Sequence, residues 1–597
     1  MGAGTTRWRR VPVGVESVRW ATRGQLRKVL LVVHNVTSAT RLLDVLPLFR
    51  DDLRVQLLTT WTESSPFDDG VAELLTRMGL PVLPWEQALE MPVDLAVSAS
   101  FGGQLDLLSG KLAVLSHGVG YNKRLGTPDA GRRTPDAGRR TPDAGRRTPD
   151  AGRRTPVFGL SPEWLLAGDT PIADALVLSH PEQFERLKAA CPQAAHTAVL
   201  GGDPCFDRML AARPYRERFR RALGVRPGQR LIVLNSTWNP QSLFGNGGEY
   251  DVLPWLLEQL ASALAADEYR LAAVLHPNLW HGHGVGQIRT WLDRACRSGL
   301  TLIDPLDGWR QALIAADAVI GDFGSVSYYA AALGLPVLLG AASGEVLDPD
   351  SPVGAFAGQA PRLNPGAALR PQVERLLAEH LPQVGPAELT TSVPGQAAAL
   401  LRRLFYELLV LPEPAHPALL GPLPLPAYQP AEITVPLRVL TQVLGPAQVA
   451  VTRYCDPLHE PAGEGGIHTA VHEDTLDPGL LDLADVVFRH GAATDHRLGS
   501  PAQWTAEVLA RHPQCALAVY VNGPGTCTVR TRAGQLLTLN AAPETTADPT
   551  VHASALLALI GAGGSRDEPR LLDALAAECL TVRTGASAHT VSLTLLR

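Results

Sequence analysis

The stretch ADAVIGDFGSVSYYAAALGLPVLL, residues 316–339, holds a strand, a polar loop, a helix and the next strand in one continuous unit. The apolar run near its start ends at Asp322-Phe323-Gly324-Ser325, and a helical stretch follows. Strands that alternate with helices in this way are typical of a parallel sheet covered by helices on both faces. The stretch therefore predicts an α/β fold.

Similar units lie on both sides of this stretch. RKVLLVVH, residues 27–34, opens a first series, and a helical stretch from about residue 38 to about residue 49 follows it. The other strands expected in this series are residues 54–59, 93–98, 112–116, 175–179 and 197–200. The second series is expected at residues 231–238, 271–278, 301–306, 318–322 and 336–340. Two Rossmann-like domains with parallel sheets are predicted.

The length of the chain requires several domains. A chain of 597 residues is too long for one ordinary core, and we expect about three units of roughly 150–200 residues. We predict a first Rossmann-like domain at 1–205, a second at 206–410, a Pro-rich linker at 411–430 and an accessory domain of α/β or α+β type at 431–597. A charged helical stretch at 206–225 would connect the first two domains. The accessory domain contains no chemical motif that we recognise.

The composition excludes several classes of partner and site. The formal charge of −6 gives no overall basic field for nucleic acid. The seven cysteines are scattered and form no CxxC pair, which argues against a zinc site and favours a reducing compartment. The N-terminal segment MGAGTTRWRRVPVG lacks the apolar region of a secretory signal, and no apolar stretch is long enough to span a bilayer. We therefore expect a cytoplasmic protein whose contact with the inner membrane face is at most peripheral.

One exact repeat interrupts the first domain. TPDAGRR occurs in four copies over residues 127–154. Each copy contains Pro and Gly and lacks an apolar seam, so the seven-residue period is not a coiled-coil heptad. Its eight arginines against four aspartates could hold an anionic partner. We favour a solvated, disordered insertion without a function of its own.

The segment SHGVGYNKR, residues 116–124, follows a predicted strand of the first domain. Ligands bind at the carboxyl ends of parallel strands, which is where His117 and Gly118 are expected. A neutral imidazole can accept a proton from a hydroxyl group, and Lys123 and Arg124 can neutralise phosphate. The alternative is a histidine that only caps a turn.

Two polar strand ends are predicted in the second domain. Ser236, Thr237 and Trp238 precede a glycine-rich loop whose backbone N–H groups could approach an anion, and the tryptophan could stack on a base or simply pack. His276 follows the next strand, and a diphosphate is a chemically reasonable ligand for it. The nearby His281 and His283 have no carboxylate or cysteine companion at metal-ligand spacing, so we expect no metal.

The loop in the opening stretch is the most informative of these motifs. Gly324 and Ser325 lie where a helix should begin, so free N–H groups, the positive end of the helix dipole and the Ser325 hydroxyl would face a donor phosphate. Asp322 belongs to the same loop. The alternative for Ser325 is an ordinary helix cap.

Taken in order, the motifs resemble those of the CDP-glycerol glycerophosphotransferases of wall teichoic acid synthesis, a branch of the GT-B superfamily. The family has a His-Gly pair, similar to His117-Gly118, and a Pro-Thr-Trp strand end, similar to residues 236–238. A His-Pro pair and an Asp-Tyr-Ser-Ser loop follow, similar to residues 276–277 and 322–325. The resemblance covers about residues 25–410. The chain departs from the family pattern at Ser236, Phe323 and Gly324.

The resemblance implies a GT-B-like pair of domains, with an acceptor domain followed by a nucleotide-donor domain. It implies His117 as the general base on an acceptor hydroxyl, and His276 and Ser325 as ligands of the donor diphosphate. The donor would be CDP-activated and the acceptor a polyol or glycan, which could be lipid-linked, in cell-wall or surface-polymer synthesis. No metal or separate cofactor is implied.

Two other functions remain open. A glycosyltransferase or nucleotide-sugar epimerase would use the same cleft for a UDP- or GDP-sugar. A degenerate binding or scaffold protein would explain the substituted loop residues and the large accessory domain. The identity of the bound ligand, and turnover after it binds, would separate these functions from glycerophosphate transfer.

Overall fold

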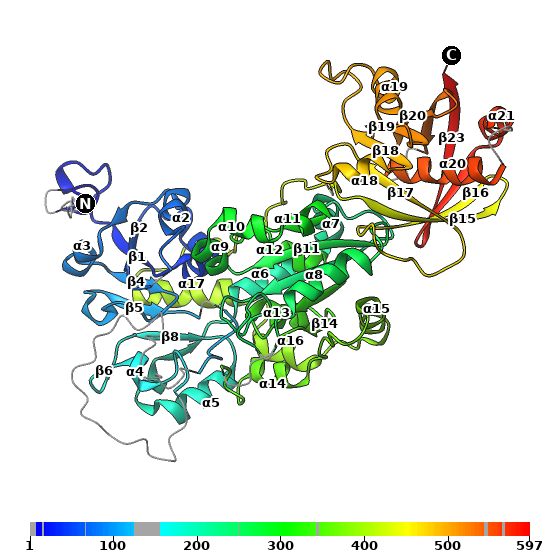
Figure 1. Ribbon diagram of the computed structural model, residues 1–597. Coiled ribbons are helices and arrows are strands. Elements are labelled where there is room, and N and C mark those ends of the chain that lie inside the picture. The colour runs from blue at the N-terminus through cyan, green and yellow to red at the C-terminus, as the bar shows by residue number, and fades with distance from the viewer. Residues whose placement is uncertain are drawn as a thin grey trace.

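A computed structural model of the chain places three bodies in a row (Figure 1). It describes residues 1–597 except for 1–7, 15–16, 66, 117, 125–155, 249, 342–345, 431, 543–546, 564–567 and 597. We call residues 27–200 lobe 1, residues 230–379 lobe 2 and residues 437–596 the barrel domain. The TPDAGRR repeat and the side chain of His117 lie outside the described residues.

Lobe 1 is built on a seven-stranded parallel sheet with the order β3-β2-β1-β4-β5-β8-β9. Its strands are β1 (Arg27–Val33), β2 (Val55–Trp61), β3 (Val82–Leu83), β4 (Leu95–Ser98), β5 (Lys111–Val114), β8 (Ala175–Leu178) and β9 (Ala198–Leu200). Its helices are α1 (Val36–Val45), α2 (Val71–Met78), α3 (Trp85–Glu90), α4 (Pro162–Leu165) and α5 (Pro181–Ala190). The central strands are buried on both faces, because separate apolar clusters cover the two sides of the sheet.

Lobe 2 repeats this design with a five-stranded parallel sheet in the order β12-β11-β10-β13-β14. Its strands are β10 (Arg230–Ser236), β11 (Tyr269–Leu275), β12 (Leu300–Leu302), β13 (Ala318–Gly321) and β14 (Val337–Leu339). Its helices are α8 (Leu253–Ser262), α9 (Pro277–His283), α10 (Val285–Trp291), α11 (Asp293–Arg297), α12 (Trp309–Ala315), α13 (Ser325–Ala332), α14 (Pro352–Gln359) and α15 (Leu369–Glu379). The strand order places the carboxyl ends of β11, β10 and β13 side by side.

The chain crosses between the lobes more than once. Helices α6 (Pro204–Ala212) and α7 (Arg216–Ala222) lead from lobe 1 into lobe 2. After α15, α16 (Val384–Thr390) packs on α13, and α17 (Ala397–Leu408) returns to the core of lobe 1 (Figure 1). Residues expected in the second domain thus complete the first. The other domain boundaries stay predictions.

The Pro-rich segment, residues 411–430, has no regular secondary structure where it is described. Arg54 of lobe 1 and Arg208 of α6 donate to its carbonyl oxygens at Pro412 and Gly421. Gln311 of lobe 2 donates to its Pro424 carbonyl oxygen. The segment therefore runs over both lobes as a bound strap.

The barrel domain is a closed barrel whose strands follow the order β15-β16-β22-β23-β21-β20-β19-β18-β17. They are β15 (Leu437–Gly445), β16 (Gln448–Tyr454), β17 (Gly466–His472), β18 (Val486–His490), β19 (Leu517–Gly523), β20 (Thr526–Thr531), β21 (Leu536–Ala541), β22 (Leu580–Thr584) and β23 (Ser587–Leu596). Its helices are α18 (Pro478–Asp482), α19 (Pro501–Arg511), α20 (Pro549–Gly563) and α21 (Glu568–Glu578). Helix α20 is apolar around most of its circumference, and it packs within the core that the strands form.

A buried arginine joins the barrel domain to lobe 2. Arg453 of β16 forms a two-pronged ion pair with Asp267 of lobe 2, with N–O distances of 2.6 and 2.8 Å. Its third nitrogen lies 3.0 Å from a carboxylate oxygen of Asp548, at the start of α20. Both Arg453 and Asp267 are almost fully buried.

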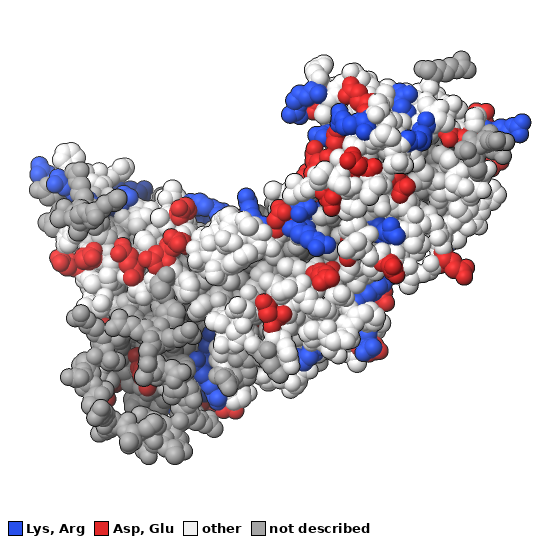
Figure 2. Space-filling model, viewed as in Figure 1, with Lys and Arg blue, Asp and Glu red and all other residues white. Residues whose placement is uncertain are grey.

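The predicted fold class is confirmed. The two parallel α/β sheets form a GT-B-like pair, and the accessory domain combines strands and helices. No helix in the described part of the chain is both long enough and apolar enough to cross a bilayer. Figure 2 shows acidic and basic side chains interspersed over the described part of one face.

Candidate functional site

The carboxyl edges of the two sheets face each other. His276 follows β11 and its Nε2 atom lies 3.5 Å from the Thr37 hydroxyl, which follows β1 in lobe 1. The aromatic ring of Trp238, after β10, meets Phe67 of lobe 1 edge-on at 4.9 Å between centroids. The predicted strand ends of lobe 2 therefore line its boundary with lobe 1.

The loop that carries His117 meets the start of α13. The Val119 N–H lies 3.4 Å from the Ser325 hydroxyl, at the first position of the helix. A Cβ atom on Gly118 would lie 2.8 Å from the same hydroxyl, so this close approach requires glycine. Gly118 and Val119, which follow His117, therefore face Ser325 across the lobe boundary.

Asp322 organises the loop before α13. Its side chain is fully buried and accepts hydrogen bonds from the backbone N–H groups of Thr237, Leu243 and Gly324 at 2.8–3.1 Å. The Ser236 hydroxyl lies 3.2 Å from the same carboxylate. Burial raises the pKa of Asp322 above its usual value, while these hydrogen bonds act to lower it. The carboxylate thus ties the end of β10 to the start of α13.

Ser325 is not the cap residue of α13, as an ordinary helix cap would require. Gly324 is the cap residue and Ser325 is the first residue of α13, and no side chain among the described residues forms a capping hydrogen bond to this helix. Its first N–H groups are consequently not satisfied by a capping side chain. A ligand with anionic oxygens could accept hydrogen bonds from them.

The imidazole of His276 has a defined orientation. Its Nδ1 atom accepts a hydrogen bond from the Asn278 N–H at 3.1 Å and so caps α9. In the neutral ring, the proton is then on Nε2, the atom that points toward Thr37. His276 can therefore donate a hydrogen bond into the space between the lobes.

Lys123 and Arg124 lie where the first domain contacts lobe 2. The Lys123 ammonium lies 5.6 Å from the ring centroid of Trp238. Arg124 lies 3.8 Å from a carboxylate oxygen of Asp348, and its N–H donates to the Val346 carbonyl oxygen. The arginine is therefore engaged by lobe 2, and its role as a phosphate ligand stays a prediction.

The known proteins that are similar to this chain are solved structures. No family model and no curated protein matches the chain. Among solved structures, the chain is similar to the wall teichoic acid polymerase TagF, with 14% identity, coverage of 64% of this chain and 89% of that chain, and a TM-score of 0.41. It is also similar to UDP-GlcNAc 2-epimerase from Neisseria meningitidis, with 10% identity, coverage of 64% and 100%, and a TM-score of 0.38.

A third similar structure is Anabaena Alr3699/HepE in complex with UDP-glucose, with 12% identity, coverage of 64% and 100%, and a TM-score of 0.34. Identities of 10–14% leave the family, donor and activity of this chain to be proposed.

A cavity of about 290 Å³ lies between the lobes. Its wall includes Thr40, whose hydroxyl donates to the Thr37 carbonyl oxygen one turn earlier in α1. The other lining residues are Leu43, Leu74, Arg77, Met78, Arg208, Leu306, Asp307, Gly308, Arg310, Gln311, Leu423 and Pro424. Apolar side chains and arginines thus share one wall, although none of the predicted site residues lines it.

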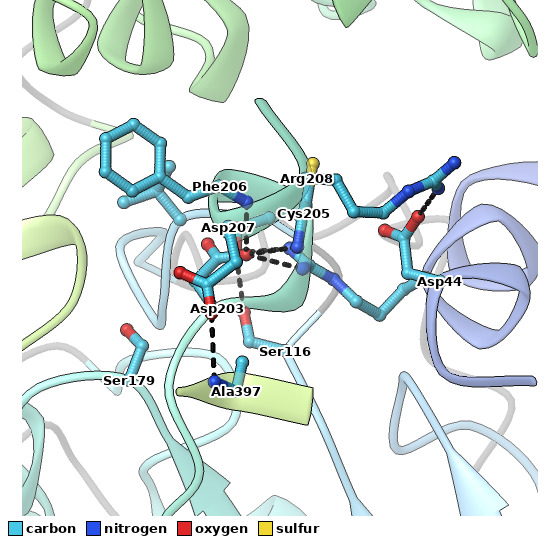
Figure 3. A network of polar contacts seen from close by, with 12 residues as sticks. Asp44, Ser116, Ser179, Asp203, Cys205, Phe206, Asp207, Arg208 and Ala397 are labelled. Atoms are coloured by element: carbon cyan, nitrogen blue, oxygen red, sulfur yellow. Dashed lines mark hydrogen bonds and ion pairs between the residues drawn. The ribbon is translucent and has the colours of Figure 1, made fainter. Parts of the chain in front are cut away.

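Buried charged side chains between the lobes were not predicted from the sequence. Asp203 accepts a hydrogen bond from Arg41 at 2.6 Å and one from the Tyr329 hydroxyl at 2.6 Å. It also caps α6, and Figure 3 shows it beside Ser116 of the His117 loop. Burial alone would lower the pKa of Arg41, but the Asp203 carboxylate, together with Tyr329, Cys205 and Asp44, raises the pKa well above its usual value. These residues come from distant segments and share no motif.

Among the residues that the structure describes, no group of three or more His, Cys, Asp or Glu side chains could hold a metal ion. His281 instead lies against Gly70 of lobe 1, where an added Cβ would overlap its ring.

Proposed function

We propose that the chain is a transferase that binds a nucleotide-activated donor between lobes 1 and 2. The observation that carries this proposal is the approach of the Val119 N–H to the Ser325 hydroxyl, at 3.4 Å across the lobe boundary. A base on the His117 loop would therefore lie close to a phosphate bound at the start of α13. Short distance and fixed orientation are a large part of enzymatic rate enhancement.

The chemistry of the cleft supports a nucleoside diphosphate derivative. The first N–H groups of α13 and the Nε2–H of His276 are hydrogen-bond donors suited to a diphosphate. The cavity beside Thr40 is not part of this proposal, because its Arg77 and Arg310 are already paired with Asp307 and Asp44.

In the transfer step, His117 would take the proton of the acceptor hydroxyl. The acceptor oxygen would then form a bond to the phosphorus that carries the transferred group. The bond from that phosphorus to the nucleoside monophosphate would break, and the monophosphate would leave. For a CDP-glycerol donor the product is a glycerophosphodiester and the leaving group is CMP. The backbone N–H groups at the start of α13 would stabilise the charge on the oxygens of the transferred phosphoryl group.

Titration calorimetry with CDP-glycerol, UDP-glucose and GDP-mannose, followed by product analysis, tests this proposal. We expect one of these donors to bind and to be consumed when a polyol acceptor is present. His117→Ala should retain binding and lose about 100-fold or more in turnover, the size typical of a missing general base.

His276→Ala supplies the complementary measurement. It should weaken donor binding about 10-fold or more through the loss of one hydrogen bond to a charged group. His283→Ala is the matched control, because His283 is exposed on the same helix. Binding of a nucleotide by the wild-type protein without any turnover would contradict transfer and favour a binding or scaffold protein.

A further inference from the structure

Three buried side chains from separate elements meet behind the His117 loop. Arg41 comes from α1, Asp203 from the start of α6, and Tyr329 from α13 of lobe 2. Arg41 donates to the Asp203 carboxylate at 2.6 Å and to the Tyr329 hydroxyl at 3.1 Å, and that hydroxyl donates to Asp203 at 2.6 Å. The exposed fractions of the three residues are 5%, 3% and 2%.

This triad reaches the peptide unit between Gly118 and Val119. The second terminal nitrogen of Arg41 donates to the Gly118 carbonyl oxygen at 3.3 Å, and the Ser116 hydroxyl donates to it at 3.2 Å. The N–H of the same peptide unit is the group that approaches the Ser325 hydroxyl. The Gly118–Val119 peptide plane is therefore held at its carbonyl oxygen by side chains of lobe 1 and at its N–H by Ser325 of lobe 2.

Helix α13 supplies both contacts on its side of the boundary. Ser325 and Tyr329 are four residues apart, so their side chains lie on the same face of the helix, one turn apart. Ser325 contacts the peptide N–H, and Tyr329 contacts the arginine that holds the carbonyl oxygen. A shift of α13 relative to lobe 1 would therefore change the position of the Gly118–Val119 peptide unit.

The energetics favour a geometric role over a stabilising one. Removing two charged groups from water is costly, so a buried ion pair is weak evidence for added stability. The planar guanidinium of Arg41, however, holds its N–H donors in a fixed fork toward three acceptors, whereas the three donors of a lysine ammonium rotate freely.

We infer that Arg41, Asp203 and Tyr329 form a positioning unit that sets the His117 loop relative to the start of α13. This inference rests on the proposed transferase function. The three residues touch neither donor nor acceptor in this scheme. They act through the Gly118–Val119 peptide unit.

A second buried ion pair provides the matched control. Asp44 of α1 accepts hydrogen bonds from Arg310 of α12 at 2.8 and 3.1 Å, so this pair also joins lobe 1 to lobe 2. No hydrogen bond or ion pair joins it to the described residues of the His117 loop. Loss of this pair should cost stability without a selective effect on the loop.

The sharpest test removes one hydroxyl. Tyr329→Phe should lower kcat for CDP-glycerol about 10- to 100-fold, with the KM for the donor nearly unchanged, because misplacement of a reacting group acts on the chemical step. Tyr328→Phe is the control: Tyr328 is equally buried, but its electrostatic neighbours are Glu182 and Thr390. Equal kcat values for Tyr329→Phe, Tyr328→Phe and wild type would overturn the inference.

Hydrogen exchange gives a readout that does not depend on turnover. Arg41→Lys and Tyr329→Phe should both speed amide exchange in the peptide that contains Val119, whereas Arg310→Lys should not. If the wild type binds no donor, the proposed function fails, and the exchange data still decide whether the unit holds the loop. If the donor is consumed but exchange at Val119 matches wild type in both variants, the positioning role fails and the transferase stands.

Discussion

His552 illustrates the cost of a polar side chain inside an apolar helix. It lies on α20 with no solvent exposure, and neither ring nitrogen has a hydrogen-bond partner among the described residues. Burial lowers the pKa of His552 from 6.5 to about 4, with a smaller opposing effect from Asp548. The pKa values of His468 and His472 are lowered to about 4 for the same main reason.

These histidines predict a loss of stability in mild acid. The unfolded chain takes up their protons near pH 6.5, whereas the folded chain does so only near pH 4. Stability is therefore full above pH 6.5 and falls as the pH drops toward 4, by about 2 kcal/mol per histidine at pH 5. Thermal unfolding measured from pH 7.5 to 4.5 should show this slope.

His552→Leu tests the assignment to one residue. It should raise stability by about 1 kcal/mol at pH 7, because an unsatisfied polar group is removed, and it should reduce the pH slope. His496→Gln is the control, since His496 is exposed. A slope that is unchanged in His552→Leu would contradict this explanation.

The polar residues at the strand ends could be predicted from the sequence, but the buried polar side chains between the lobes could not. Ser236, His276 and Ser325 could be found because each follows an apolar run at a parallel strand end. Arg41 could not, since a charged residue in a helix is ordinarily solvent-exposed and only the packing of the two lobes buries this side chain. Tyr329 could not either, since its hydroxyl contacts residues from distant segments.

At the scale of elements, the ends of the repeat insertion lie together. Arg124 and Val157 form an antiparallel bridge, and the Phe158 N–H donates to the Lys123 carbonyl oxygen at 2.9 Å. The residues between them lie outside the described part of the chain. An insertion whose two ends are adjacent can change length without strain on the sheet.

Deletion of residues 127–154 should therefore leave soluble expression unchanged and the midpoint of thermal unfolding within about 2 °C of wild type. Donor binding should also be retained. A Gly/Ser segment of equal length is the control that separates the effect of length from that of the arginines. A collapse of expression in the deletion but not in this control would show that the spacing of the ends matters.

The elements themselves were largely readable from the sequence, because apolar runs of strand length alternate with helical stretches through both lobes. The closure of the barrel domain could not be predicted from the sequence. A strand pattern specifies which face is apolar, but the pairing of β16 with β22, which joins Gln448 to Thr581, is a long-range event. Nor did the sequence indicate that α17 returns to lobe 1.

At the scale of the whole molecule, Arg453 determines how the barrel domain is attached. Arg453→Met would leave Asp267 buried without its main cation, and breaking a buried pair costs about 3–5 kcal/mol. We expect the barrel domain to unfold separately, as a second transition in calorimetry. Retention of a single transition at the wild-type temperature would contradict this role.

Arg294→Met is the control for that experiment. Arg294 and Asp456 also link lobe 2 to the barrel domain, but their N–O distance is 3.9 Å and the arginine side chain is 67% exposed. An exposed pair of this kind contributes about 1 kcal/mol or less. The control should therefore unfold as the wild type does.

The strap has a mechanical consequence for the cleft. Arg54 fastens it to one lobe at Pro412, and Gln311 fastens it to the other at Pro424. A hinge rotation that drew the lobes apart would lengthen the path between these two anchors. Prolines stiffen the chain. Such a rotation would therefore have to extend the irregular segment or break one of these two hydrogen bonds.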